Sequence, residues 1–157
     1  MGTLSNTIPV QPRAERTLPL RAAPGARVGA GVIAGLILAV LVTAAWLSPN
    51  QAGHGSHTQL GLAPCTWAIW FDKPCPTCGM TTAFAQAGEG NWIRSLSTQP
   101  FGFLLVIGSA AVFWGALTQA VTGARLGSSL TGLLRPSVFL ILGVLFVGSW
   151  VYKVLIW

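Results

Sequence analysis

The stretch that decides the fold runs from Val28 to Leu47 and reads VGAGVIAGLILAVLVTAAWL, without a single charged residue. As an α-helix it would extend for about 30 Å, which matches the hydrocarbon thickness of a bilayer. A signal peptide is the competing interpretation, but its apolar core usually has only about 7–15 residues, and no small-residue cleavage site follows. We therefore expect an uncleaved first transmembrane helix at 28–47.

Two further segments share this length and apolar character. They run from Phe101 to Val121 and from Pro136 to Trp157, each with a proline at or just before its start. Proline is tolerated in the first turn of a helix. Only 8% of the residues are charged, against about 25% in an average soluble domain, so the chain lacks a polar surface. The sequence predicts an all-α membrane protein with three transmembrane helices, at about 28–47, 101–121 and 136–157.

The basic residues lie mostly outside the apolar segments, before the first one or in the loops between them. Most of them precede the first segment or lie in the short loop 122–135, whereas in the long loop 48–99 the basic residues are balanced by acidic ones. This placement is typical of a topology signal, and we expect no nucleic-acid partner despite the net charge of +6. The flanking residues are Arg13, Arg16, Arg21, Arg27, Arg125 and Arg135, and the loop residues are Lys73, Arg94, Asp72 and Glu89.

The positive-inside rule places the N-terminus in the cytoplasm, and the loop 48–99 and the C-terminus outside, in a bacterial cytoplasmic (inner) membrane. Residues 1–27 are rich in proline and arginine and show no periodicity, which predicts a disordered cytoplasmic tail before one membrane domain at 28–157. Near the end of the third segment, Lys153 lies among aromatic residues. We expect its side chain to extend to the lipid headgroups.

The long loop contains all three cysteines, Cys65, Cys75 and Cys78. The last two are separated by two residues and followed by Gly79, and this spacing lets both sulfurs face one centre, as in zinc and iron sites. The same spacing serves a redox dithiol, in which Cys75 would attack and Cys78 would resolve. A structural disulfide outside the cell is a third alternative.

A closed zinc site needs a fourth ligand besides the three cysteines. His54, His57 and Asp72 are the candidates, but both histidines lie in a stretch rich in glycine and serine, which favours a solvated loop. Cys65, Cys75 and Cys78 are therefore the candidate ligands of a zinc or iron site, and His57 is a less favoured candidate for the fourth position. A thioredoxin fold around the cysteines is excluded, because the loop is too short for it.

The rest of the loop is amphiphilic. Trp67, Trp70 and Phe71 have the i, i+3, i+4 spacing of one helical turn, which would place them together on the bilayer interface or against the spans. Short helices are also expected at about 81–87 and, capped by Asn91, up to about residue 96. The sequence thus predicts short interfacial helices between the first two transmembrane helices.

The motif itself resembles a family of small bacterial membrane proteins known as domain of unknown function 2752, over about residues 61–104. The matching residues are Gly61, Cys65, Pro74, Cys75, Pro76, Cys78, Gly79 and Thr81. The resemblance implies a multi-span membrane protein with this motif beside a helix, and it implies no settled activity. The chain departs from the family at Thr82, where arginine is frequent, and at Gln99, where asparagine is frequent. Anion binding by an arginine at this position is therefore not expected here.

These observations favour a non-enzymatic membrane protein of unknown activity, with an external cysteine cap that is structural or metal-binding. Such a cap would support a membrane protein partner or a homo-oligomer. The alternative is a membrane thiol-disulfide oxidoreductase that uses Cys75 and Cys78. A transporter is less favoured, because three spans make a poor pore and no acidic or basic residue marks the middle of the membrane.

Overall fold

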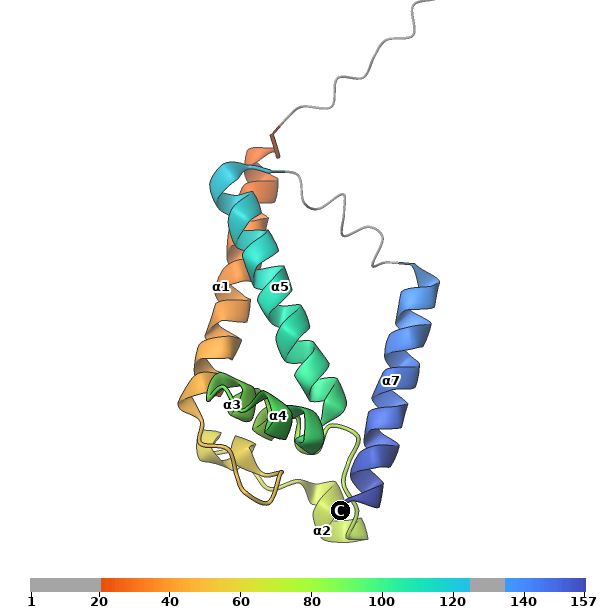
Figure 1. Ribbon diagram of the computed structural model, residues 1–157. Helices are drawn as coiled ribbons and strands as arrows, with labels where there is room; N and C mark the ends of the chain where they lie inside the picture. The colour runs from red at the N-terminus through yellow and green to blue at the C-terminus, as the bar shows by residue number, and fades with distance from the viewer. Residues whose placement is uncertain (1–20, 125–134) are drawn as a thin grey trace, which may run out of the picture.

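The computed structural model describes residues 21–124 and 135–157, and every regular element in these ranges is helical. Three helices are long and apolar enough to cross a membrane. A run of short helices lies between the first and the second of them along the chain (Figure 1). The long helices are α1 (Pro24–Trp46), α5 (Pro100–Thr122) and α7 (Pro136–Leu155). The short ones are the 3₁₀ helix η1 (Ser56–Leu60), α2 (Thr66–Phe71), α3 (Met80–Gly88) and α4 (Trp92–Thr98). The expected all-α membrane fold is confirmed.

The helix boundaries differ by a few residues from those expected. α1 begins at Pro24 instead of Val28, because proline pre-sets the backbone angle of a first helical turn. Residues 24–27, expected in the disordered tail, are therefore helical, whereas residues 1–20 of that tail lie outside the described part of the chain. α7 ends at Leu155, before the expected end at Trp157.

α1 and α5 form the closest pair of long helices (Figure 1). Ala30 and Ala34 are buried along α1, at 7% and 4% exposure, and small side chains let two helix backbones approach in lipid. At the end of the pair, Arg27 donates hydrogen bonds to the carbonyl oxygens of Ala120 and Val121, at 3.1 and 2.9 Å. Arg27 thereby supplies hydrogen-bond donors to carbonyl groups in the last turn of α5.

The buried core lies around α3, which contacts α1, α4 and α5. Thr82, Ala83 and Ala85 of this helix are completely buried. The Ser95 hydroxyl of α4 donates to the Ala83 carbonyl oxygen at 2.7 Å, and the Thr82 and Ser56 hydroxyls are 2.9 Å apart. The region formed by residues 47–99, which we call the cap, is therefore folded onto the membrane helices and not suspended from them.

The cap lies at one end of the molecule. The C-terminal end of α1, the N-terminal end of α5 and the C-terminal end of α7 meet there (Figure 1). Arg21, Arg27 and Arg135 lie at the opposite ends of these helices. Arg13, Arg16 and Arg125 of the expected charge pattern lie outside the described residues.

Candidate functional site

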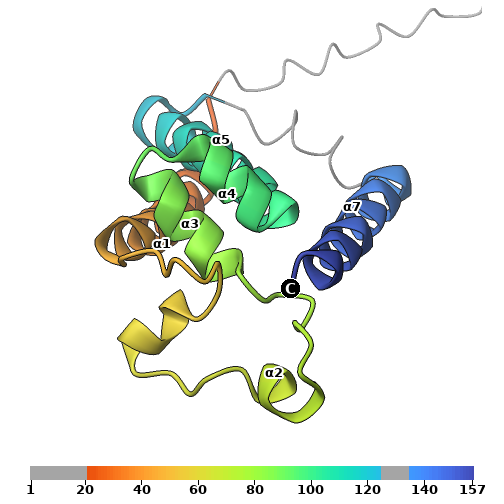
Figure 2. The ribbon, with the colours of Figure 1, turned by 60° about the horizontal axis from the view of Figure 1, so that its bottom comes forward.

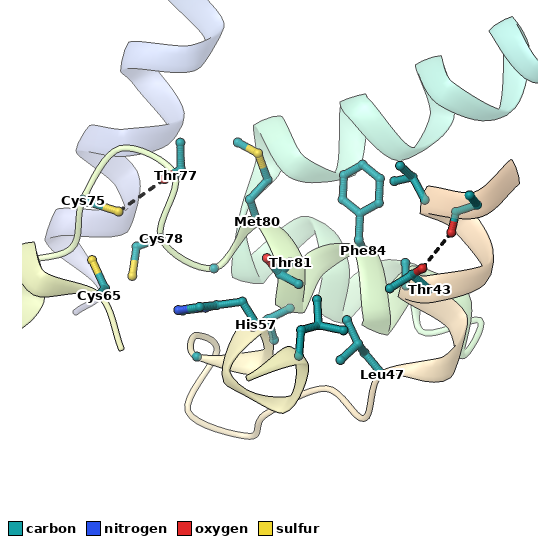
Figure 3. Close-up of a pocket in the computed structure, with 17 residues that line it drawn as sticks. Thr43, Leu47, His57, Cys65, Cys75, Thr77, Cys78, Met80, Thr81 and Phe84 are labelled. Atoms are coloured by element: carbon teal, nitrogen blue, oxygen red, sulfur yellow. Dashed lines mark hydrogen bonds between the residues drawn. The ribbon is translucent and has the colours of Figure 1, made fainter. Parts of the chain in front are cut away.

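The three cysteines form a cluster. Cys65 directly precedes α2, and Cys75 and Cys78 lie in the loop that leads into α3. Their sulfur atoms all lie within 4.8 Å of one another, and all three are free thiols (Figure 3). Cys78 is buried, whereas Cys65 and Cys75 are partly exposed. The cluster therefore brings together the residue that precedes α2 and the loop that follows α2.

A tight turn positions the second and third cysteines. The Cys78 amide donates to the Cys75 carbonyl oxygen at 2.9 Å, so both side chains leave one turn. Gly79 follows with φ of +88°, and a Cβ atom there would lie 2.7 Å from the carbonyl oxygen of Gly53. A left-handed backbone and a close approach thus both require glycine at this position.

Hydrogen bonds from distant helices hold the cysteine loop. The indole N–H of Trp150 in α7 donates to the Pro74 carbonyl oxygen at 3.0 Å, and the Gln99 amide donates to the Pro76 carbonyl oxygen at 3.3 Å. Ser149 links these contacts, because its hydroxyl donates to Gln99 Oε1 at 2.6 Å. The carbonyls on both sides of Cys75 are therefore fixed by α7 and by the residue before α5.

Lys153 does not extend to the membrane surface as expected. Its side chain is only 4% exposed, and Nζ donates to the Gly53 carbonyl oxygen at 3.2 Å. The same Nζ also lies close to Gly79, 3.3 Å from the position that a Cβ atom would take there. The ammonium group is close enough to interact with a charge on Cys78, and within residues 21–124 and 135–157 it has no carboxylate partner.

The thiols differ in acidity. Burial, together with the neighbouring charges of Cys75 and Cys65, raises the pKa of Cys78 to about 11. The backbone amide of Ala68 lies near the Cys65 sulfur and lowers the pKa of that thiol. The Cys65 side chain makes no capping hydrogen bond at the start of α2. The buried thiol is therefore the hardest to ionise unless a cation compensates its charge.

The cluster forms one end of an open cavity of about 650 Å³ (Figure 3). The sulfur end also carries Thr77, whose hydroxyl lies 3.4 Å from the Cys75 sulfur. Away from the sulfurs the lining is largely apolar and reaches α1 at Ala39 and Val40. A polar, sulfur-rich end and an apolar end thus share one cavity.

The two histidines lie apart from the cluster's ligand atoms. His57 lines the same cavity and extends toward the cysteines (Figure 3), but its Nε2 lies 3.2 Å from the Ala63 carbonyl oxygen. His54 packs on Trp157 with ring centroids 4.5 Å apart. In the described ranges, the potential metal ligands that lie within 4.8 Å of one another are the three cysteines, and they include neither histidine nor Asp72.

A second, polar cavity of about 390 Å³ lies between residues 49–51 and the helices α3 and α4. Gln86 lines it with 7% exposure, and its Oε1 has no hydrogen-bond partner among the described residues. A buried carbonyl oxygen without a donor costs about 1–3 kcal/mol. We therefore expect an ordered water molecule in this cavity to donate to it.

Sequence reasoning missed Trp150, Gln99 and Lys153 as neighbours of the cysteine loop. The signal for Lys153 was present, because an ionisable residue in an apolar helix is by default a functional candidate. Gln99 and Trp150 carried no comparable signal, since a glutamine before a helix and a tryptophan near a membrane surface are both common.

Comparison with known proteins gives one match. No curated protein and no solved structure matches the chain. Residues 65–113 match the family model described as Protein of unknown function (DUF2752). The match begins at Cys65 and includes the cysteine loop, α3, α4 and the first half of α5. The chain is an integral membrane protein of unknown activity, and this segment of it is similar to the DUF2752 family, which confirms the resemblance expected from the cysteine motif.

Proposed function

We propose that the protein binds one zinc ion in its cap through the thiolates of Cys65, Cys75 and Cys78. The observation that carries this proposal is the placement of three sulfur atoms within 4.8 Å of one another. Thiolates are soft ligands that select zinc and iron–sulfur clusters. Because clusters usually need four thiolates, three cysteines favour zinc.

The dimensions of the cluster fit this ion. At a Zn–S distance of about 2.3 Å, the sulfurs of a tetrahedral site lie about 3.8 Å apart. A contraction of about 1 Å or less would therefore close the cluster around zinc. Three thiolates and a divalent ion leave one net negative charge, which the buried ammonium group of Lys153 would offset.

The proposed role of the ion is structural. None of the residues of α2 is buried, and Figure 2 shows this helix standing away from α1, α3 and α4. Few other contacts of this helix would order the segment, so a bond from Cys65 to a metal shared with Cys75 and Cys78 would hold it. The ordered cap would then offer a fixed surface to a membrane protein partner or to a second copy of the chain.

The proposed orientation has the cap outside a bacterial cytoplasmic membrane and the N-terminus inside. Arg21, Arg27 and Arg135 at the end opposite the cap support it through the positive-inside rule. A single cysteine introduced at Ser97, in a variant without the native cysteines, should react with a membrane-impermeant maleimide on intact cells. Protection of the introduced thiol until the cells are lysed would reverse the orientation.

Metal analysis of the purified protein tests the function. We expect about one zinc per chain in the wild type, and loss of the metal in C78S. T81S is the matched control, because it changes the same region and leaves every thiol in place. A wild-type protein that contains no metal when purified without chelators, and takes up none from added zinc, would refute the proposal.

The alternative is a membrane thiol-disulfide oxidoreductase. The partial exposure of Cys75 beside the buried Cys78 supports it, because an attacking thiol must be reachable and a resolving thiol need not be. The raised pKa of Cys78, about 11, opposes it, since few resolving thiolates would exist at neutral pH. A Cys75–Cys78 disulfide that forms and is reduced in the metal-free protein by a dithiol partner would favour this function.

A further inference from the structure

The cavity beside the cysteine cluster extends from the cap into the membrane region. Its polar end is formed by Cys65, Cys75 and Cys78, and its opposite end by residues of α1 (Figure 3). Phe84 and Leu47 line the wall between the two ends. A volume of about 650 Å³ lies within the range of ordinary small-molecule sites.

The apolar end faces lipid. α1 is one of the three candidate membrane spans, and Val40, in its second half, is 55% exposed while it lines the cavity. The outer surface of Val40 is therefore lipid-facing, and the cavity continues that surface inward. A molecule dissolved in the bilayer can thus enter without crossing water.

The polar end offers a coordination position. Zinc takes four ligands, and sites with three protein ligands leave the fourth to a small molecule. His57 lines the cavity, but its Nε2 lies against the Ala63 carbonyl oxygen, and its ring is outside the group of ligand atoms. The fourth position would therefore face the cavity.

The charges select the kind of ligand. Lys153 offsets the one net negative charge of three thiolates on a divalent ion, and the described residues that line the cavity include no lysine or arginine that could pair with a further anion. An anionic head group would find no partner there, whereas a neutral nitrogen, oxygen or sulfur donor can bind the metal without repulsion.

We propose that this cavity binds a single-chain amphiphile from the bilayer, with its apolar chain beside α1 and α3 and its neutral donor head on the metal. This inference rests on the proposed zinc site, and it extends the role of that site from holding the cap to binding a ligand. The affinity comes from two sources, which are coordination of the head and burial of the chain.

Cobalt can replace zinc to test the proposal, because Co²⁺ bound by thiolates absorbs visible light with bands that depend on the number and type of ligands. The full-length protein, loaded with Co²⁺ in nanodiscs, is titrated with N-dodecylimidazole, which combines a neutral metal-binding head with a chain. N-methylimidazole has the same donor head without the chain, and dodecyl maltoside has the chain without the metal-binding head.

We expect N-dodecylimidazole to shift the cobalt bands at a concentration at least about tenfold below that needed with N-methylimidazole, and dodecyl maltoside to leave them unchanged. Partition of the probe into lipid also raises its local concentration, so the decisive comparison uses variants. V40W narrows the apolar end, whereas V42W changes a similarly exposed residue of α1 outside the cavity, with 59% exposure against 55% for Val40.

In V40W, N-dodecylimidazole should shift the cobalt bands only at concentrations close to those needed with N-methylimidazole. The response of this variant to N-methylimidazole, and its cobalt spectrum without a probe, should be those of the wild type. V42W should behave as the wild type. An equal response of V40W and wild type to N-dodecylimidazole, with cobalt bound in both, would overturn the inference and leave the metal site intact. Failure of the wild type to bind cobalt would overturn both.

Discussion

Two parts of the membrane region are attached to the molecule in different ways. α1 packs along α5 through small side chains such as Ala34, which is 4% exposed. α7 stands apart from this pair over most of its length and meets the rest at the cap end (Figure 1). Its contacts there include the hydrogen bonds of Ser149, Trp150 and Tyr152, beside the ring contact between Phe146 and Phe101.

The two kinds of helix attachment differ because the long helices are surrounded by lipid and not by water. Lipid chains are as apolar as leucine, so apolar surface alone does not drive helices together in a bilayer. Close backbone approach holds α1 to α5, whereas α7 depends on hydrogen bonds with groups of the cap. Damage to the cap end of α7 should therefore cost more than changes in the lipid-facing parts of the long helices.

The largest effect is expected at Gly79. In G79A the new Cβ would lie 2.7 Å from the Gly53 carbonyl oxygen, on a backbone with φ of +88°. Gly90 is the matched control, because its φ is +82° and a Cβ there meets nothing within 4 Å. We expect G90A to cost about 1–2 kcal/mol of unfolding free energy, and G79A to cost about 1–3 kcal/mol more.

Denaturant titration of both variants in mixed micelles measures this difference. Equal losses in G79A and G90A would mean that the close approach between Gly79 and Gly53 does not exist in the folded protein.

Removal of the Ser149 hydroxyl should have the next largest effect. This group donates to Gln99 Oε1 and accepts from the Phe101 amide at 3.0 Å. S149A would leave a buried amide oxygen without its donor, at a cost of about 1–3 kcal/mol. S97A, whose exposed hydroxyl bonds only the nearby Arg94 carbonyl oxygen, should stay within about 0.5 kcal/mol. Similar unfolding curves for S149A and S97A would contradict the attachment of α7 through the cap.

We expect a smaller loss of unfolding free energy in W150F. This variant keeps an aromatic ring and removes the N–H that donates to the Pro74 carbonyl oxygen, so it should cost about 0.5–1.5 kcal/mol. Because Pro74 precedes Cys75, alkylation of Cys75 in the metal-free protein should also become faster. W114F, at an exposed tryptophan of α5, is the control. Unchanged alkylation in W150F would show that α7 does not position the cysteine loop.

The smallest expected change in unfolding free energy concerns two glycines of α5. A Cβ at Gly102 would lie 3.2 Å from the Ala83 Cβ, whereas a Cβ at Gly108 meets nothing within 4 Å. G102A should therefore lower the unfolding free energy by about 1 kcal/mol, since α3 must shift slightly. G108A should change it by less than about 0.5 kcal/mol. A greater loss in G108A, measured in the same micelles, would reverse the comparison between the cap and the spans.

The sequence predicted the long helices well, because length and hydropathy are local properties. The short helices were also recognisable, since Trp67, Trp70 and Phe71 have helical spacing, and α2 spans Thr66–Phe71. The three cysteines lie together for a local reason, as Cys75 and Cys78 share one turn and Cys65 is near them in the chain.

The surroundings of the cysteines could not be predicted. The Lys153–Gly53 and Trp150–Pro74 hydrogen bonds join residues far apart in the chain, and no residue type marks such pairs. The expected exposure of Lys153 was wrong for the same reason, because the direction of its side chain depends on where α7 ends relative to the cap. His57 reaches the cavity but not the ligand group, a distinction that residue spacing does not contain.

X-ray absorption at the zinc edge of the purified protein measures the ligands of the proposed ion. We expect three sulfur neighbours at about 2.3 Å and one lighter atom, nitrogen or oxygen, which together complete a four-coordinate site. C65S should lower the number of sulfur neighbours by one or release the metal. A spectrum with fewer than three sulfur neighbours in the wild type would contradict the three-cysteine site.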